Sequence, residues 1–125
     1  MTEEIKVGLT HQTEKTVAFE DTAAALGSGF VEVLATPMMI AVMEGTCAAC
    51  VKPYLPETLS TVGTHVNVSH RAAVDIGETY FTECELIAID RKKLTFKVRA
   101  FTQDKTIGEG THDRFIIDVS KFLNK

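Results

Sequence analysis

One stretch decides the fold: Thr36-Pro37-Met38-Met39-Ile40-Ala41-Val42-Met43-Glu44-Gly45-Thr46-Cys47-Ala48-Ala49-Cys50. A hydroxyl residue followed by proline predicts a helix start, because Thr can cap the helix and Pro lacks an amide that would have no partner there. Pro53 should end the helix, which we expect over about residues 37–52. Its residues are apolar or small on every side, so the rest of the chain should wrap around it.

Glu44 is the exception in this apolar helix. An ionised carboxylate beside Val42, Met43 and Cys47 is costly unless another group satisfies it. We therefore treat Glu44 as a candidate functional group. The function then depends on which group interacts with its carboxylate in the folded protein.

Composition limits the classes of protein that this sequence can encode. Its 125 residues are enough for one domain, 1–125, with a single core. The net charge of −4 argues against a nucleic-acid surface, although local basic residues could still hold one small polyanion. The N-terminus has no secretory pattern, and the helix is too short, with Glu44 too central, to cross a membrane.

Three cysteines without an export signal indicate reduced thiols and a cytoplasmic location. Cys47 and Cys50 form a Cys-x-x-Cys motif, but it ends an apolar helix instead of opening one after a strand. We interpret it as core packing and not as a redox or metal site. The four histidines show no ligand spacing, so no metal site is expected.

The sequence after the helix alternates with the period of a β-strand. Four strands are predicted over 60–70, 78–90, 93–102 and 106–118, preceded by a first strand at 6–17 and a short helical turn at 19–26. Turn residues separate the four strands, so each neighbouring pair should form a hairpin in an antiparallel sheet. Only a sheet that curls around the helix would bury it, which gives an α+β fold. Such a sheet leaves an edge strand and part of the helix uncovered, which favours a dimer.

His70 is the second misplaced ionisable group. Counting by twos, it ends an inward-facing row of Thr64, Val66 and Val68. Thr36, His70 and Glu44 could then serve as hydroxyl, base and orienting carboxylate, with amides at the helix start polarising a carbonyl oxygen. The structural alternatives are a simple helix cap for Thr36 and a core histidine for His70.

Several short motifs, in their order and spacing, resemble the hot-dog-fold thioesterases, in particular the fluoroacetyl-CoA thioesterase-like branch. They are Ala35-Thr36, Met43-Glu44, Val62-Gly63-Thr64, Val68-Ser69-His70 and Gly110-Thr111-His112-Asp113-Arg114. The resemblance runs from Phe30 to Asp118. It implies an antiparallel sheet around a long helix, and a homodimer or higher oligomer with active sites at the subunit interface.

The resemblance also implies site residues and a substrate. The catalytic Thr, Glu and His of the family fall on Thr36, Glu44 and His70. A glycine and an arginine that line the site fall on Gly63 and Arg114. The fluoroacetyl-specialised members place two aromatic residues before the catalytic Thr. Here Phe30 fits one position and Gly27 stands at the other, so the resemblance supports thioester hydrolysis but not selection for fluorine.

The leading hypothesis is an acyl-CoA thioesterase for a short-chain acyl group, with coenzyme A entering only as part of the substrate and no other cofactor. The alternative is a hot-dog protein that binds an acyl thioester without hydrolysing it. Hydration of an unsaturated acyl-CoA is a third possibility, but the Asp and His of hot-dog hydratases have no counterpart here. Arg71 should point to the pocket rim, so Arg71 and Arg114 are candidates for gripping the phosphates or the pantetheine entrance, while Arg114 could also be a solvated strand charge.

Overall fold

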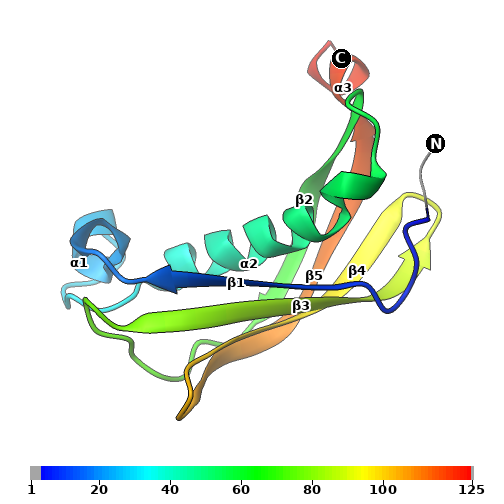
Figure 1. Cartoon of the computed structure of the whole chain (residues 1–125). Helices are drawn as coiled ribbons and strands as arrows, with labels where there is room; N and C mark the ends of the chain where they lie inside the picture. Colours follow the sequence, from blue (N-terminus) through cyan, green and yellow to red (C-terminus); the bar gives the residue numbers. More distant parts are fainter. Residues whose placement is uncertain (1–3, 125) are drawn as a thin grey trace.

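The long helix lies in the hollow of a curled sheet. A computed structural model describes residues 4–124, with α2 (Thr36–Val51) on the concave side of one five-stranded antiparallel sheet (Figure 1). The predicted α+β architecture is confirmed. The other elements are β1 (Thr10–Thr16), η1 (Phe19–Asp21), α1 (Ala23–Leu26), η2 (Lys52–Tyr54), β2 (Leu59–Val68), β3 (Thr79–Asp90), β4 (Lys93–Phe101), β5 (Thr106–Asp118) and α3 (Val119–Leu123).

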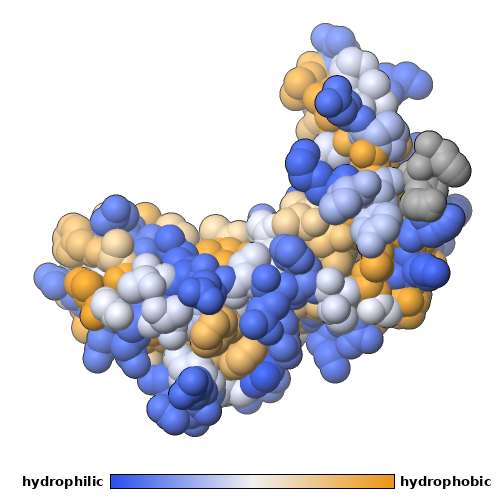
Figure 2. Space-filling view, in the orientation of Figure 1, coloured by the Kyte–Doolittle hydropathy of each residue, from blue (hydrophilic) through white to orange (hydrophobic). Residues whose placement is uncertain are grey.

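One side of α2 is packed and the other is open. The packed side carries Met39, Met43 and Cys47, which are at most 1% exposed and belong to the main hydrophobic core. These residues are four apart, so they share one face of the helix. The opposite face is exposed and carries Pro37, Ala41 and Gly45. Figure 2 shows apolar and neutral side chains in the hollow above this face, between the body of the molecule and the arm that ends in α3.

The strand order corrects one prediction. The order is β1-β3-β4-β5-β2, so β3–β4 and β4–β5 are neighbours as predicted, but β2 pairs with β5. The expected hairpin of β2 with β3 is therefore wrong. The chain after β2 runs along β5 instead, where the amides of Ser69 and Arg71 donate to the carbonyls of Glu109 and Ile107. As a result, β2 is an edge strand.

Two glycines on β5 allow β2 to lie this close. A Cβ atom at Gly110 would overlap the carbonyl oxygen of Asn67 and lie 2.7 Å from the Cα of Val68. A Cβ at Gly108 would overlap the carbonyl oxygen of Ser69 and lie 2.8 Å from the sulfur of Met39. The position of the end of β2, and of the residues that follow it, therefore depends on glycine, which has no side chain, at positions 108 and 110.

Replacing Gly110 with alanine should therefore destabilise the fold. The new methyl group meets backbone, which has little freedom to move, so we expect the free energy of unfolding to fall by about 1–3 kcal/mol. Urea unfolding followed by circular dichroism measures the change. Gly45→Ala is the matched control, because no atom lies within 4 Å of its Cβ position and alanine favours a helix over glycine by about 0.5–1 kcal/mol. A Gly110→Ala protein as stable as Gly45→Ala would contradict the close approach.

A bulge in β2 removes Thr64 from the predicted inward-facing row. The register between β2 and β5 shifts between Gly63 and His65, so a count by twos from Thr61 does not continue across the bulge. Thr61 is buried, whereas Thr64 is exposed and Val66 is 37% exposed. Thr64 has no partner in this register and is exposed, so the prediction that it faces inward is wrong. Val66 and Val68 pair with His112 and Gly110 on the inner side of β5, and Val68 packs against the core, so the prediction is confirmed for these two residues. His70 lies beyond the end of β2, in the segment after it that runs alongside β5.

Candidate active site

Thr36 and His70 are in contact. The Thr36 Oγ1 lies 2.7 Å from the His70 Nδ1, which is a hydrogen-bond distance. Thr36 is not the cap of α2, because Ala35 occupies that position and no side chain caps the helix. The simple capping role is therefore wrong, and the hydroxyl group is committed to the imidazole.

His70 is held as a neutral base. Burial lowers its pKa, while a hydrogen bond to the backbone of Ala72 partly opposes the shift. The residues on each side, Ser69 and Arg71, are fixed to β5 by their backbone amides. A neutral imidazole whose Nδ1 faces a hydroxyl group can accept its proton, which is the usual requirement for activating an oxygen nucleophile.

Thr36 and His70 line one cavity of about 390 Å³ together with two further predicted site residues, Phe30 and Arg71. Phe30 is fully exposed. Arg71 forms an exposed ion pair with Glu109 at 2.7 Å. The other lining residues are Ala23, Ser28, Gly29, Val31, Val33, Leu34, Pro37, Ala72 and Ala73. One half of the predicted site is thus assembled around the start of α2.

The start of α2 offers fewer free amides than expected. The Met39 amide already donates to the carbonyl of Ala35 at 3.0 Å, so it is not available to a ligand. The Met38 amide donates to no other group in residues 4–124, and it remains at the positive end of the helix dipole. The Met38 amide is thus a donor at this end that could polarise a carbonyl oxygen.

Glu44 does not join Thr36 and His70. It follows Thr36 by eight residues, or about 12 Å along the helix, and it is half-buried. Across residues 4–124 its carboxylate has no hydrogen bond or ion pair. Its charge acts instead on two residues of β5, His112 and Arg114. The expected chain of three side chains is therefore incomplete within one copy of the protein.

Arg114 is buried, so its alternative interpretation as a solvated strand charge is wrong. Only 7% of it is exposed. Its guanidinium donates to Thr61 Oγ1 at 2.8 Å and to the Thr61 carbonyl at 2.9 Å, and it contacts His112 Nε2 at 3.1 Å. Gly63 lies beside this group, since a Cβ there would be 3.3 Å from Arg114 Nη1. Glu44, Gly63 and Arg114 thus form the second half of the predicted site.

His112 is the residue that sequence reasoning missed. Its side chain is buried, with 1% exposed, whereas the sequence showed it only as one of four histidines without a common spacing. The signal lay in its spacing, because Gly110, His112 and Arg114 are two apart on one strand and share a face.

The three cysteines form a buried cluster, as the core-packing interpretation predicted. Cys47, Cys50 and Cys84 are at most 6% exposed and are unpaired. Burial raises the pKa of Cys50 to about 12, and a hydrogen bond with Cys47 raises that of Cys84 further. Thiolates, which bind metals and attack disulfides, are therefore disfavoured. Within residues 4–124, no group of three His, Cys, Asp or Glu side chains is arranged to hold a metal ion.

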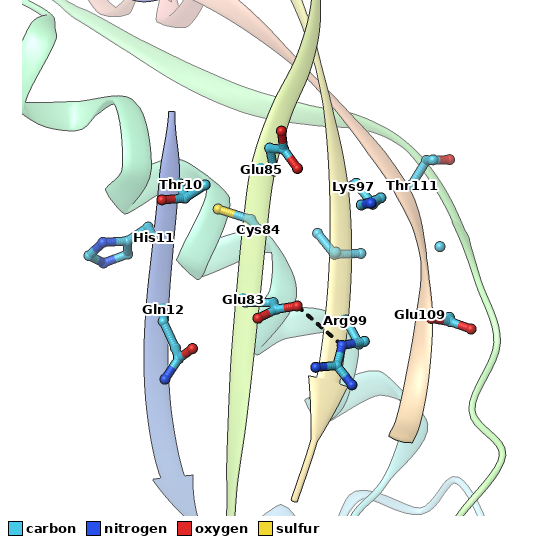
Figure 3. Close-up of a pocket in the computed structure, with 12 residues that line it drawn as sticks. Thr10, His11, Gln12, Glu83, Cys84, Glu85, Lys97, Arg99, Glu109 and Thr111 are labelled. Atoms are coloured by element: carbon cyan, nitrogen blue, oxygen red, sulfur yellow. Dashed lines mark hydrogen bonds and ion pairs between the residues drawn. The ribbon is translucent and has the colours of Figure 1, made fainter. Parts of the chain in front are cut away.

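Another cavity, of about 580 Å³, contains none of the predicted site residues. Figure 3 shows its charged side chains on β3 and β4, where Glu83 and Arg99 pair at 3.1 Å. Acidic and basic residues alternate across these strands and neutralise one another, which is typical of a solvated sheet surface. We therefore place the functional site at α2 and not here.

The chain is similar to known proteins in sequence and in structure. Residues 17–120 match the family model of the fluoroacetyl-CoA-specific thioesterases. The fluoroacetyl-CoA thioesterase of Streptantibioticus cattleyicolor is 37% identical over 96 residues, which cover 77% of this chain and 69% of that protein.

Solved structures show the same fold. A mutant of the fluoroacetyl-CoA thioesterase FlK in complex with acetyl-CoA is 30% identical, with a TM-score of 0.91 over 96% of this chain and 95% of that one. A hot-dog-like protein from Thermanaerovibrio acidaminovorans is 17% identical, with a TM-score of 0.86 over 94% of this chain and 87% of its own. The second likeness concerns the fold alone, and the predicted hot-dog fold is confirmed.

Proposed function

The chain belongs to the fluoroacetyl-CoA-specific thioesterase family, and from this premise we propose that it hydrolyses short-chain acyl-CoA thioesters with Thr36, His70 and Glu44. The observation that carries the proposal is the 2.7 Å contact between the Thr36 hydroxyl and a neutral His70 in a cavity at the start of α2. The cavity of about 390 Å³ suits a small acyl group, and the solved FlK mutant holds acetyl-CoA. Coenzyme A enters as part of the substrate, and the scheme needs no other cofactor.

The reaction consumes water and releases a carboxylic acid and a thiol. In the proposed mechanism, His70 takes a proton from the Thr36 hydroxyl, or from a water held by it, as the oxygen attacks the thioester carbonyl. The Met38 amide donates to the carbonyl oxygen as it becomes negative. The C–S bond then breaks, and the protonated His70 returns its proton to the departing thiolate. If Thr36 itself attacks, the one water that the reaction consumes enters afterwards and hydrolyses the acyl-Thr36 ester, which restores the Thr36 hydroxyl.

Substrate contacts extend from the same cavity. We assign Phe30 to cover the acyl group, since it is fully exposed beside Thr36 in the cavity wall. Arg71 is assigned to the CoA phosphates or the pantetheine arm, because its side chain is half exposed at the cavity. Gly63 leaves Arg114 approachable from the edge of β2. Gly27 is exposed at the end of α1 and supplies no aromatic ring, so selection for fluorine is not part of the proposal.

The complete site requires a second copy of the chain. We propose a homodimer, or a higher oligomer built from it, in which the edge strand β2 pairs antiparallel with β2 of another copy. Residues 63–67 of this edge are all exposed. A two-fold axis reverses the strand, so the His70 end of one copy meets the Thr61–Gly63 end of the other. Thr36 and His70 would then face Glu44 and Arg114 across the interface.

A cytoplasmic location completes the proposal. The three unpaired thiols are stable in a reducing compartment. None of the helices in residues 4–124 is long and apolar enough to cross a membrane.

A panel of acyl-CoAs tests the function directly. Purified protein is mixed with acetyl-, propionyl-, butyryl-, hexanoyl-, decanoyl- and fluoroacetyl-CoA, and the free thiol released is followed with time. We expect turnover with the short chains and no large preference for fluoroacetyl-CoA over acetyl-CoA. Saturable binding without thiol release for every member would favour the non-catalytic acyl-thioester binding protein and overturn the proposal.

Activity should persist to unusually low pH. Burial lowers the pKa of His70, so the imidazole stays neutral and able to accept a proton below its ordinary value of 6.5. The acidic limb of kcat/KM against pH should thus have an apparent pKa under 6.5. The fold should be checked by circular dichroism at each pH, so that unfolding is not read as titration. A limb centred above 6.5, with the fold intact, contradicts His70 as the base.

A further inference from the structure

His112 has a fixed tautomer. Its Nε2 lies 3.1 Å from Arg114 Nη1, and its Nδ1 lies 2.8 Å from the carbonyl oxygen of His65. A guanidinium can only donate hydrogen bonds, and a carbonyl can only accept them. The imidazole must therefore accept at Nε2 and donate from Nδ1, which is possible only for the neutral Nδ1–H form.

The environment favours the same neutral form. Burial lowers the pKa of His112, and the charge of Arg114 lowers it too, while the hydrogen bond to His65 and the charges of Glu44 and Asp113 oppose the shift.

His112 and Arg114 together hold the irregular part of β2. Arg114 is bonded to Thr61, before the bulge, and His112 to His65, after it. Gly63 lies between these two anchors, and a Cβ there would be 3.1 Å from the His112 Cε1. No side chain at position 63 separates the pair from the edge of the sheet.

The guanidinium of Arg114 depends on His112 for its orientation. Thr61 fixes the Nε and Nη2 side of the group, and His112 is the partner of Nη1. Nη1 is also the atom beside Gly63, on the side where the second copy and the substrate should lie. Without an acceptor from residue 112, Nη1 loses its partner and the guanidinium is held only by its two bonds to Thr61. Nη1 can then shift away from Gly63 and from the charge of Glu44, which acts on both Arg114 and His112.

We propose that His112, as the neutral Nδ1–H tautomer, is a positioning residue that orients Arg114 beside Gly63 and Glu44 for thioester hydrolysis. The proposal rests on the proposed function of this site. His112 does not touch substrate in this scheme and acts through Arg114.

Two substitutions separate the two hydrogen bonds of His112. Glutamine can place an acceptor near the Nε2 position and keep the contact with Arg114. Asparagine can place a donor near the Nδ1 position and keep the contact with His65. We expect His112→Gln to retain most of the turnover, and His112→Asn to lower kcat by about tenfold to a hundredfold with little change in KM. A purely structural role predicts that kcat follows the melting temperature of each variant instead.

A double-mutant cycle tests whether the effect passes through Arg114. In an Arg114→Gln background, His112→Asn should cause no further loss of kcat, because the group that it orients is already gone. An equal loss in both backgrounds, or normal kcat in folded His112→Asn protein, overturns the proposal. Absence of turnover in the unmodified protein would instead overturn the proposed function. In either case, the ¹⁵N spectrum of histidine-labelled protein reads the tautomer, and a protonated Nε2 at His112 excludes the proposed role even if a variant fails to fold.

Discussion

Replacing Glu44 with glutamine should lower kcat for acyl-CoA hydrolysis by about a thousandfold while leaving KM within a few-fold of the original value. The substitution keeps the volume of the side chain and removes only its charge. That charge acts on both His112 and Arg114 without a direct contact, so its loss weakens the negative field at the site while breaking no hydrogen bond or ion pair. Steady-state kinetics on acetyl-CoA measures the effect.

The fold should not suffer from this substitution. Glu44 makes no hydrogen bond or ion pair within residues 4–124, so Glu44→Gln should unfold at the same temperature as the unmodified protein. Glu57→Gln, an exposed change, is the matched control for the loss of one carboxylate. If Glu44→Gln turns over normally and Glu44→Ala only lowers stability, the carboxylate is structural.

A mixture of inactive chains extends this prediction. Where each site combines Thr36 and His70 of one copy with Glu44 of the other, a mixed dimer of Thr36→Ala and Glu44→Gln chains contains one intact site. After exchange of subunits, the mixture should recover about a quarter of the unmodified activity per chain, because about half the dimers are mixed and each has one working site. No recovery in a mixture shown to exchange subunits would contradict a site shared between copies.

Replacing Thr36 with alanine should lower kcat by a similar factor, about a thousandfold. The hydroxyl group is bonded to His70, and alanine leaves that imidazole without an oxygen to activate or to position. Thr36→Ser keeps the oxygen and should remain within about tenfold of the original rate. Rapid quenching followed by mass spectrometry, on the unmodified protein and on Thr36→Ser, would reveal an acyl ester at this position if the hydroxyl itself attacks.

The stability of Thr36→Ala separates catalysis from helix capping. Since Ala35 is the N-cap of α2, Thr36→Ala loses only the exposed hydrogen bond to His70, and the melting temperature should fall less than in a variant that loses a cap. Thr22 is the matched control, because its side chain accepts a hydrogen bond from the Ala25 amide at the start of α1. Thr22→Ala should cost about 1 kcal/mol of stability. Full activity in Thr36→Ala would remove this residue from the mechanism.

Local patterns predict the elements of this fold well. The start of α2 follows from Thr36-Pro37 and its end from Pro53, and both signals depend only on neighbouring residues. The alternation in β3 and β4 predicts their buried faces for the same reason. The predicted contact of Thr36 with His70 is also present, although the two residues are far apart in sequence.

The pairing of β2 could not be read from alternation. It depends on close approach of backbone at Gly108 and Gly110, and a glycine on a strand has no side chain to show which neighbour it admits. The bulge between Gly63 and His65 then puts Thr61, before it, and Val66, after it, on the same face of the sheet, which a count by twos across the bulge cannot detect. The residues near Glu44 could not be predicted either. His112 and Arg114 lie on β5, and the alternation of that strand does not show which part of the helix it faces.

The thiol cluster between α2 and β3 gives this protein a built-in reporter of its own opening. Reagents for free thiols react with thiolates, and the pKa of Cys50 is raised to about 12 within the core. Such a reagent can reach Cys47 and Cys84 only after the helix has separated from the strand. Coenzyme A released by turnover reacts at once, whereas the cysteines react at the rate of helix opening. A single recording would therefore contain a fast phase from catalysis and a slow phase that measures how often the core comes apart.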